Sequence, residues 1–469
     1  MRLHHLSERI WEEERVPTEW KEGVIISFYK NKGDIRNPAN YRPITLLSTP
    51  SKVVTSVILR RLQPLILNKR RPQQAGFTPN RSTAECILAL RVLAQKRREF
   101  RQPLFSAFVD LRAAFDSLDR RALWLLLQGI GVPPKLLNII RDLYSDTTCR
   151  IRADGSLSDP FPTTSGVRQG CVAAPNLFNI AVDYWLQRSL DRCPHLGVSQ
   201  PELNHSKITD LCYADDVSIF AELLDTISDA LEVLSEEASP LGLTVNWAKT
   251  KIQSLSDFLS PLPNSIQLSN ATVEAVTEFT YLGSKITSDC SSSGEIDRRI
   301  RMAFGSFGRL QKVWRSSRIS AATKFRVLNT CILPIVTYAS EAWTLSAAQL
   351  QRIDAFHRKC LRSILSIRWF HRVPNDELYN RAGNPTRLTT IIKRSRLRLL
   401  GHVARLPEDV PAHQILVGAS LPPPRIWHRP RGRPRRTWTA EMANIAPLSD
   451  LLTAAQDRER FRELVATIT

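Results

Sequence analysis

The chain has 469 residues, of which 43% are hydrophobic and 7% aromatic, and this content excludes a wholly disordered protein. Lys and Arg number 65 against 45 Asp and Glu, so the net charge is +20. An excess of this size favours a polyanionic partner, because cationic side chains neutralise phosphates. The length corresponds to roughly two to four compact domains.

The positive charge is concentrated in the C-terminal third of the chain. Residues 1–290 carry 34 basic and 32 acidic side chains, whereas residues 291–436 carry 28 basic and 8 acidic ones. We therefore expect a nearly neutral body followed by a region that binds a polyanion. The eight cysteines are scattered without a CxxC pair, and neither a signal peptide nor a membrane-spanning run is evident. These features predict an intracellular protein with no membrane partner.

Residues 1–290 have the pattern of a mixed α+β body. Short β-rich runs predict strands at 23–30, 104–111, 242–246, 251–255 and 278–287, a pair near 148–163, and a strand-turn-strand at 208–221. Apolar residues at helical spacing predict helices over 51–67, 83–99, 119–129, 134–144, 170–190 and 222–238. After residue 291 only helices are expected, at 293–315, 320–332, 347–366 and 386–405, with a Pro-rich break at 420–434.

Two acidic signals stand at the ends of predicted strands. Asp110 closes an apolar strand, where an unpaired carboxylate is costly, and Asp215 and Asp216 lie at the tip of the predicted hairpin. If the strands are neighbours, Asp110 and Asp215 face a common point and can bridge divalent cations, for which oxygen ligands and Mg²⁺ are well matched. The alternative is an ordinary hairpin tip, because Asp tolerates turn geometry.

A series of blocks, in order along residues 20–440, resembles the reverse transcriptases of non-LTR (LINE-type) retrotransposons. The resemblance to the fingers region lies in NYRPITLL (40–47) and QQAGFTPNRST (73–83). Polymerase motifs A to D and the next strand block are similar to FVDLRAAFDSLD (108–119), SGVRQGCVAAPNLFNI (165–180), YADDV (213–217), GLTVNWAKTK (242–251) and EFTYLGSKIT (278–287). Three blocks further along the chain resemble the RTE-like members of this family: ILPIVTYASEAWTL (332–345), LRLLGHVARLP (397–407) and RGRPRRTW (431–438).

The resemblance implies an α+β right-hand polymerase, with fingers and an antiparallel palm sheet followed by an all-helical basic thumb and C-terminal region. The expected divisions are fingers at 1–105, palm at 106–290, thumb at 291–372 and a basic C-terminal extension at 373–469. It also implies a truncated open reading frame, without the endonuclease that an intact element needs.

The resemblance assigns roles to individual positions of the active site. Asp110 and Asp215 would hold two Mg²⁺ ions, or Mn²⁺ in their place, with support from Asp216 and the carbonyl of Leu111. Substrate contacts are implied for Phe115 as an aromatic gate against the ribose 2′-OH, Gln169 and Gly170 beneath the nucleotide, Lys249 as a proton donor to pyrophosphate, and Lys30 and Arg42 at the triphosphate. The alternatives are a core Phe115, a helix N-terminus around Gly170 and solvated basic side chains.

The basic helical region would hold the template–primer duplex by its backbone. The residues expected to contact nucleic acid are Arg298, Arg299, Arg301, Arg309, Lys312, Arg315, Arg318, Arg431 and Arg433. A solvated basic face is the alternative for the first seven. The last two lie in a segment that also resembles an AT-hook core.

The function implied is RNA-directed DNA synthesis, with an RNA template, a DNA primer and deoxynucleotides as partners and the nucleus as the expected location. Motif B departs from the family pattern at Ala173, Ala174 and Asn176, and motif A departs from it at Ala113. These departures leave a catalytically silent nucleic-acid-binding remnant as the alternative. An RNA-synthesising polymerase is disfavoured by the large ring of Phe115.

Overall fold

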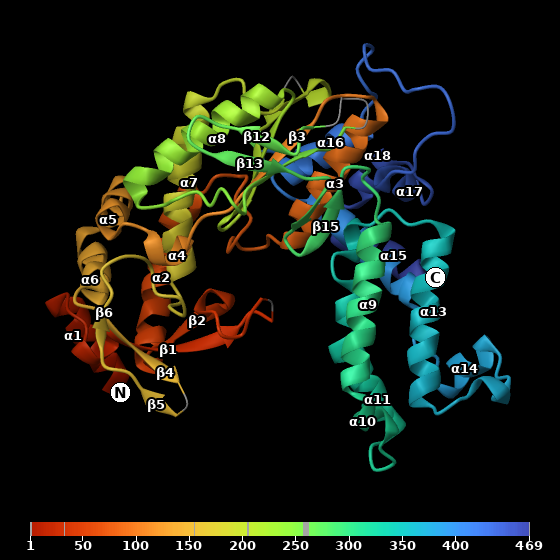
Figure 1. Ribbon diagram of the computed structural model, residues 1–469, viewed down its shortest axis with the longest axis horizontal. Helices are drawn as coiled ribbons and strands as arrows, with labels where there is room; N and C mark the ends of the chain where they lie inside the picture. The colour runs from red at the N-terminus through yellow and green to blue at the C-terminus, as the bar shows by residue number, and fades with distance from the viewer. Residues whose placement is uncertain (1, 32, 154, 204–205, 257–261, 469) are drawn as a thin grey trace.

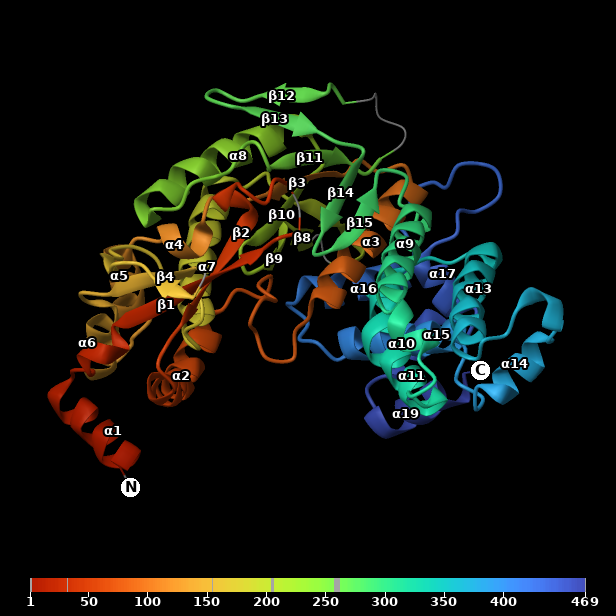
Figure 2. The same ribbon diagram turned by 60° about the horizontal axis from the view of Figure 1, so that its bottom comes forward.

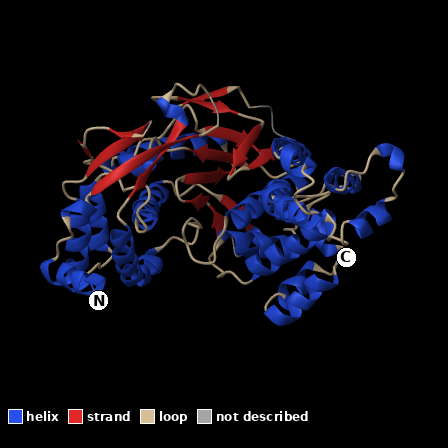
Figure 3. Cartoon of the chain, turned by 90° about the horizontal axis from the view of Figure 1, so that it is seen from below, coloured by secondary structure: helices blue, strands red, loops and turns tan. Residues whose placement is uncertain are grey.

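The computed structural model describes residues 2–31, 33–153, 155–203, 206–256 and 262–468. Figure 1 shows an arch in which the N-terminal elements form one arm, a large sheet lies at the top, and C-terminal helices form the other arm. Seen from below, the strands lie between two groups of helices (Figure 3). No helix among these described residues is both long and apolar enough to cross a membrane.

The first arm is built on a five-stranded sheet with helices packed beside it. Its strands are β1 (Glu22–Tyr29), β2 (Tyr41–Leu46), β4 (Thr148–Ala153), β5 (Ser156–Leu157) and β6 (Phe161–Pro162). β1 pairs antiparallel with β2 and parallel with β4. The helices of this arm are α1 (Arg2–Glu13), α2 (Thr49–Lys69), α4 (Ala114–Ser117), α5 (Arg120–Gly129) and α6 (Pro134–Tyr144).

A six-stranded sheet at the top of the arch has the strand order β12-β13-β11-β3-β10-β9. The strands are β3 (Phe105–Val109), β9 (Asp210–Tyr213), β10 (Asp216–Ala221), β11 (Lys251–Ser254), β12 (Ser265–Gln267) and β13 (Thr272–Ala275), and β12 and β13 form its outer edge in Figure 2. Every residue of β3 is buried, because helices cover both faces of the sheet. Ala107 and Val109 pack with α7 (Ala174–Arg192) and α8 (Leu224–Ala238), whereas Phe108 packs on the opposite face with α3 (Thr83–Glu99).

The second arm is helical apart from two small hairpins that adjoin the central sheet. The hairpins are β7 (Val198–Gln200) with β8 (Ser206–Ile208), and β14 (Glu278–Tyr281) with β15 (Ser284–Thr287). The arm itself contains α9 (Ser293–Arg309), α10 (Gln311–Arg315), α11 (Ala321–Val327), α12 (Leu333–Thr337), α13 (Ala347–Ile364) and α14 (Asn375–Arg381) around a core of its own. The last helices are α15 (Leu388–Ala404), α16 (Pro411–Ser420), α17 (Trp438–Ala443), α18 (Leu448–Ala454) and α19 (Arg458–Thr467).

Helix α3 joins the palm sheet to the C-terminal helices. Its Lys96 Nζ donates to the Gly418 carbonyl of α16 at 2.6 Å, and its Gln95 side chain accepts from the Trp438 backbone N–H at 2.8 Å. One hydrophobic core contains α3, Phe108 and Phe220 of the sheet, and apolar residues of α15 to α19. The packing therefore does not follow the divisions at residues 105 and 372, which stay predictions.

Most predicted elements are present, and the exceptions have physical reasons. The strand predicted at 242–246 is wrong, because only Val245 bridges to Leu111 and the chain then turns at 247–249. The helix predicted over 293–315 is divided into α9 and α10 at Leu310. Helix α1 was not expected from the sequence pattern. The strand-turn-strand predicted at 208–221 is confirmed as β9 and β10.

The buried ion pair between Arg71 and Asp210 offers a test of how this fold is held. Their two hydrogen bonds measure 3.0 and 2.8 Å, and both side chains are buried. We expect Arg71→Met to lower the free energy of unfolding by about 3–5 kcal/mol, because it leaves the buried carboxylate of Asp210 without its cation. Urea denaturation measures this loss. Arg71→Met with Asp210→Leu is expected to cost far less, and equal losses in the two variants would contradict the account.

Candidate active site

Three carboxylates meet where β3 ends and β10 begins. Val109 pairs with Val217 across the antiparallel strands, so the next residues, Asp110 and Asp216, become neighbours. Asp215 lies beside them in the turn between β9 and β10, which Ala214 closes with a left-handed backbone (φ 57°).

The three carboxylates repel one another. Burial and the charge of Asp110 raise the pKa of Asp215, while the cations of Arg42 and Lys249 act in the opposite direction. The pKa of Asp216 is raised to about 6, first by burial and then by the charges of Asp215 and Asp110. A cluster whose charges are mutually unfavourable is stabilised by a cation.

The Oδ2 atom of Asp110 is buried and accepts no hydrogen bond from the residues described, and its ion-pair contact is Lys249 Nζ at 3.3 Å. Among the described residues, no group of three or more His, Cys, Asp or Glu side chains is placed to hold a metal ion. Carboxylate and backbone carbonyl oxygens are the ligand type that hard divalent cations prefer. The side chain of Leu111 is buried, so only its backbone can contribute to the site.

A buried glutamine holds the turn that carries Asp215. The Oε1 atom of Gln74 accepts hydrogen bonds from the backbone N–H groups of Gly76 (2.9 Å) and Ala214 (2.8 Å), and its Nε2 donates to Cys212 Sγ at 3.0 Å. Gly76 lies so close to the turn that a Cβ atom there would be 2.3 Å from the Ala214 nitrogen. The sequence did not indicate a role for Gln74 or Gly76 beyond membership of the block at 73–83.

The residues predicted beneath the nucleotide lie on a loop that is joined to β2. The carbonyl of Gln169 accepts from the Thr45 N–H at 2.8 Å, and Gly170 has φ 118° with the Thr45 carbonyl 2.2 Å from where a Cβ would be. The Gln169 side chain donates to Asp116 at 3.3 Å. Phe115 is half-buried and stacks on Phe178 with ring centroids 4.3 Å apart, so it has a packing role whatever else it does.

The three basic residues predicted at the triphosphate lie at different positions relative to the carboxylates. Lys249 contacts Asp110, and the positive charge of Arg42, on β2, acts on Asp215. Lys30 lies just after β1, where its backbone N–H donates to the Asn40 carbonyl at 2.8 Å. The structure therefore brings Lys249 and Arg42 toward the carboxylates, while the role of Lys30 stays a prediction.

The predicted thumb contacts divide into internal and exposed groups. Arg298 and Arg299 both bind the buried carboxylate of Glu295 and the carbonyl of Gly283, and Arg299 lies 4.3 Å above the Tyr338 ring. The phosphate contacts expected for these two side chains stay predictions. The exposed members are Arg301, Arg309, Lys312 and Arg315 on α9 and α10, Arg318 in the turn after α10, and Arg431 and Arg433 in the long loop before α17 (Figure 1).

A mainly antiparallel sheet with clustered carboxylates at its strand ends, between a mixed α/β arm and a helical arm, defines the palm of a right-hand nucleic-acid polymerase. The sequence model of the family described as "Reverse transcriptase (RNA-dependent DNA polymerase)" matches residues 29–286. This match covers more than half of the chain, and the chain belongs to that family. The fold class and the family expected from the sequence are confirmed.

Relatives with curated descriptions come from mobile elements. The chain is 28% identical to the "Retrovirus-related Pol polyprotein from type-1 retrotransposable element R2" of Popillia japonica, over 50% of this chain and 32% of that protein. It is 23% identical to the "RNA-directed DNA polymerase from mobile element jockey" of Drosophila melanogaster, over 77% of this chain and 39% of that protein. The Xenopus laevis "Transposon TX1 uncharacterized 149 kDa protein" is 28% identical over 48% of this chain and 17% of its own length.

The chain thus matches less than two fifths of the length of these relatives. Among solved structures, a telomerase from Candida tropicalis in complex with a fragment of telomeric RNA is 13% identical, with a TM-score of 0.44, over 99% of this chain and 68% of that one.

Substitution of Gly76 tests the close packing against the carboxylate turn. We expect Gly76→Ala to lower the free energy of unfolding by about 1–3 kcal/mol, because the new methyl group must displace the Ala214 backbone. Chemical denaturation measures the change. Gly129→Ala is the control, since a Cβ there meets nothing within 4 Å, and it should leave stability unchanged or raise it by up to about 1 kcal/mol. Equal effects of the two substitutions would refute a tight contact at Gly76.

The raised pKa of Asp216 predicts a pH-dependent stability. Between pH 3.8 and about 6 the folded chain holds a proton that the unfolded chain has released, so the stability falls as pH rises through this window. Asp216→Asn should therefore stabilise the protein above pH 6, by about 1 kcal/mol after allowance for solvent screening, and the gain should fade toward pH 4. Urea midpoints at pH 4.5 and pH 8 measure the difference. A gain that is the same at both pH values would count against the repulsion.

Proposed function

We propose that this chain catalyses RNA-directed DNA synthesis as the polymerase of a non-LTR retrotransposon. The observation that carries the proposal is that Asp110, Asp215 and Asp216 lie together where β3 ends and β10 begins, in a chain of the reverse transcriptase family. The reaction joins a deoxynucleotide to a primer: the 3′-OH attacks the α-phosphate, a new phosphodiester forms, and pyrophosphate leaves.

Divalent cations, Mg²⁺ by preference, fit the donor set on this edge. Asp110 and Asp215 would hold them together with the Leu111 carbonyl, and Asp216 would add negative charge beside them. When bound, such ions stabilise the attacking and leaving oxygens of an in-line displacement. The Oδ2 of Asp110, which accepts no hydrogen bond from the residues described, and the raised pKa of both hairpin carboxylates support this assignment.

The chain's own side chains would position the nucleotide. Arg42, whose charge acts on Asp215, would bind a phosphate of the incoming triphosphate, for which a guanidinium is well shaped. Lys249, 3.3 Å from Asp110, would hold a proton within reach of the departing pyrophosphate. Phe115 would lie beneath the sugar and leave no room for a 2′-hydroxyl, and Gly170 would let the backbone approach the base pair closely.

The proposed partners are an RNA template, a DNA primer or target, and deoxynucleotides, with action in the nucleus. Their support is the excess of basic residues over acidic ones in residues 291–436, including exposed arginines on α9 and α10. A catalytically silent remnant is the second candidate, favoured by the motif B residues Ala173, Ala174 and Asn176. All three are buried at the start of α7, where they support the core.

Primer extension on an RNA template tests the proposal. We expect DNA synthesis that requires Mg²⁺ and that falls on the order of a thousandfold in Asp215→Asn, since several kcal/mol of charge stabilisation are lost at about 1.4 kcal/mol per tenfold. Asp225→Asn is the matched control. This exposed carboxylate lies in the first turn of α8, and its loss should leave the rate unchanged.

The outcome also separates the alternatives. Preference for ribonucleotides over deoxynucleotides would overturn the proposal in favour of an RNA-synthesising enzyme. Failure of the wild-type chain to extend the primer, with tight salt-sensitive binding of the primed template, would establish the silent remnant. Equal rates for Asp215→Asn and wild type would remove this carboxylate from the chemistry.

A further inference from the structure

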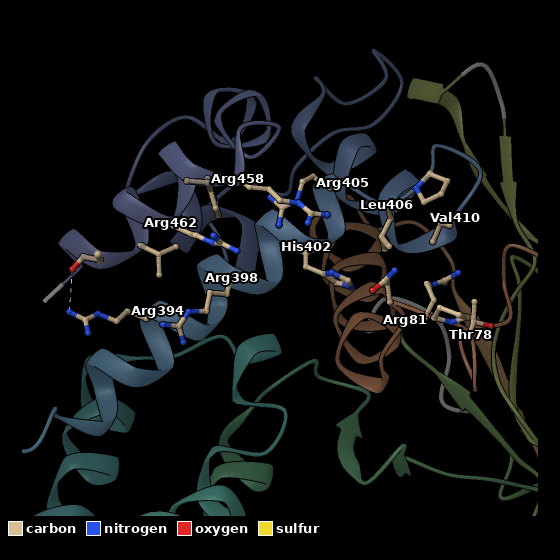
Figure 4. Close-up of a pocket in the computed structure, with 16 residues that line it drawn as sticks. Thr78, Arg81, Arg394, Arg398, His402, Arg405, Leu406, Val410, Arg458 and Arg462 are labelled. Carbon is tan, nitrogen blue, oxygen red and sulfur yellow. Dashed lines mark hydrogen bonds between the residues drawn. The ribbon is translucent and has the colours of Figure 1, made fainter. Parts of the chain in front are cut away.

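A basic groove of about 930 Å³ lies between the C-terminal helices and the loop that precedes α3 (Figure 4). Apolar side chains such as Leu406, Val410 and Phe461 form part of its lining. Its cationic side chains come from three elements that are far apart in the sequence, and Figure 4 shows them around one space. We call this cavity the arginine groove, and its cations are Arg81, Arg394, Arg398, His402, Arg405, Arg458 and Arg462.

The buried carboxylate of Glu85 is engaged by two of the side chains that line this groove. Arg81 forms an ion pair with the buried Glu85 carboxylate, and His402 Nε2 lies 3.1 Å from its other oxygen. Arg394 donates to the carbonyls of Ile468 (3.0 Å) and Ala466 (3.2 Å). These contacts fix part of the wall and leave the rest of the positive charge without a protein counterion.

The remaining arginines repel one another. Burial lowers the pKa of Arg405, and the positive charges of Arg458 and Arg462 lower it further. Arg398, Arg458 and Arg462 are exposed and form no hydrogen bond or ion pair with any residue that the structure describes. Like charges held together in this way on two helices raise the energy of the empty groove, and an anion would relieve the repulsion.

The groove is connected to the active site through a short segment of chain. Gly76 contacts the turn of the carboxylate hairpin, and five residues later Arg81 lies in the wall of the groove. The intervening Thr78, Pro79 and Asn80 line the cavity. A long polyanion bound at the carboxylates could therefore extend along the chain segment 76–81 to the basic side chains of the groove.

We propose that the arginine groove binds a nucleic-acid strand by its backbone phosphates, as a site for the part of a template or primer strand that extends beyond the active site. The inference rests on the proposed function for its choice of ligand. Guanidinium groups match phosphate oxygens in a two-pronged geometry, and phosphate contacts carry no base sequence. The groove is separate from the exposed arginines of α9, α10 and the 421–436 loop.

Salt-dependent binding tests the proposal. A fluorescein-labelled single-stranded RNA, and separately a DNA of the same sequence, is titrated with the full chain at several NaCl concentrations, and the affinity is read from anisotropy. The variant is the triple substitution Arg398→Gln, Arg458→Gln and Arg462→Gln. Because each single-strand phosphate contact contributes about 0.7 to the slope of log affinity against log salt, we expect the slope to become shallower by about 2.

A second triple substitution is the matched control. Arg15→Gln, Arg60→Gln and Arg121→Gln remove the same charge from exposed positions in the other arm of the arch, and the slope should stay that of the wild type. Replacing Arg398, Arg458 and Arg462 by Lys keeps the charge and should preserve most of the slope. Thermal unfolding of each variant verifies that it is folded.

Each outcome bears on the proposal. A shallower slope for RNA alone assigns the groove to the template, one for DNA alone assigns it to the primer strand, and one for both assigns it to either backbone. An unchanged slope, or the same loss in the control, overturns the proposal. Labelled polyglutamate serves as a second probe. If the groove substitutions abolish its binding and leave the binding of nucleic acid unchanged, the groove takes an acidic protein and the proposal is overturned.

The binding test does not depend on catalysis. The titrations contain neither nucleotides nor divalent cations, so a strand can bind without being extended. If the wild-type chain extends no primer, the groove substitutions can still weaken its binding of nucleic acid. If the wild-type chain does extend short primed templates, the groove substitutions can still leave its binding unchanged. Failure of this inference is thus distinguishable from failure of the proposed function.

Discussion

The whole site depends on one buried amide, the side chain of Gln74. Its oxygen accepts two backbone N–H groups, one of which belongs to the turn between β9 and β10, and its nitrogen reaches Cys212 in β9. An unsatisfied amide at this depth would be costly, so the turn has one favourable position. Since Asp215 follows Ala214 directly, the same bonds fix the carboxylate whose neighbours repel it.

Like charges repel one another at two places in this molecule: the carboxylates repel one another at the palm, and the arginines do so in the arginine groove. The fold offsets the two repulsions by different means. At the palm edge, Lys249 and the charge of Arg42 act on the carboxylates, which keep an oxygen free of hydrogen bonds from the residues described. In the arginine groove, Arg81 and His402 contact the carboxylate of Glu85, and other arginines keep no counterion among the described residues. Charges held in place before a ligand arrives lose little freedom when it binds.

Local patterns predicted the parts of this fold that local patterns control. The β9–β10 hairpin and the run of helices followed from alternation and helical spacing. The role of Gln74 did not, because its partner lies 140 residues away. The ion pairs of Arg298 and Arg299 with Glu295 follow from positions three and four residues apart on one helix, and the phosphate contacts expected of these arginines stay predictions. The strand expected at 242–246 is absent, because within this segment only Val245 forms a β-bridge, to Leu111.

The position of α3 between the palm sheet and the C-terminal helices affects how the protein emerges from the ribosome. Its partners in α15 to α17 lie at residues 388–443, far later in the chain, and they share one core with it. During synthesis the face of α3 that packs against these helices therefore stays uncovered until residues 388–443 have been made. Contacts of such long sequence separation form slowly and leave apolar surface exposed in the meantime. The nascent chain is thus most vulnerable to aggregation in the interval between the synthesis of α3 and that of α15 to α17.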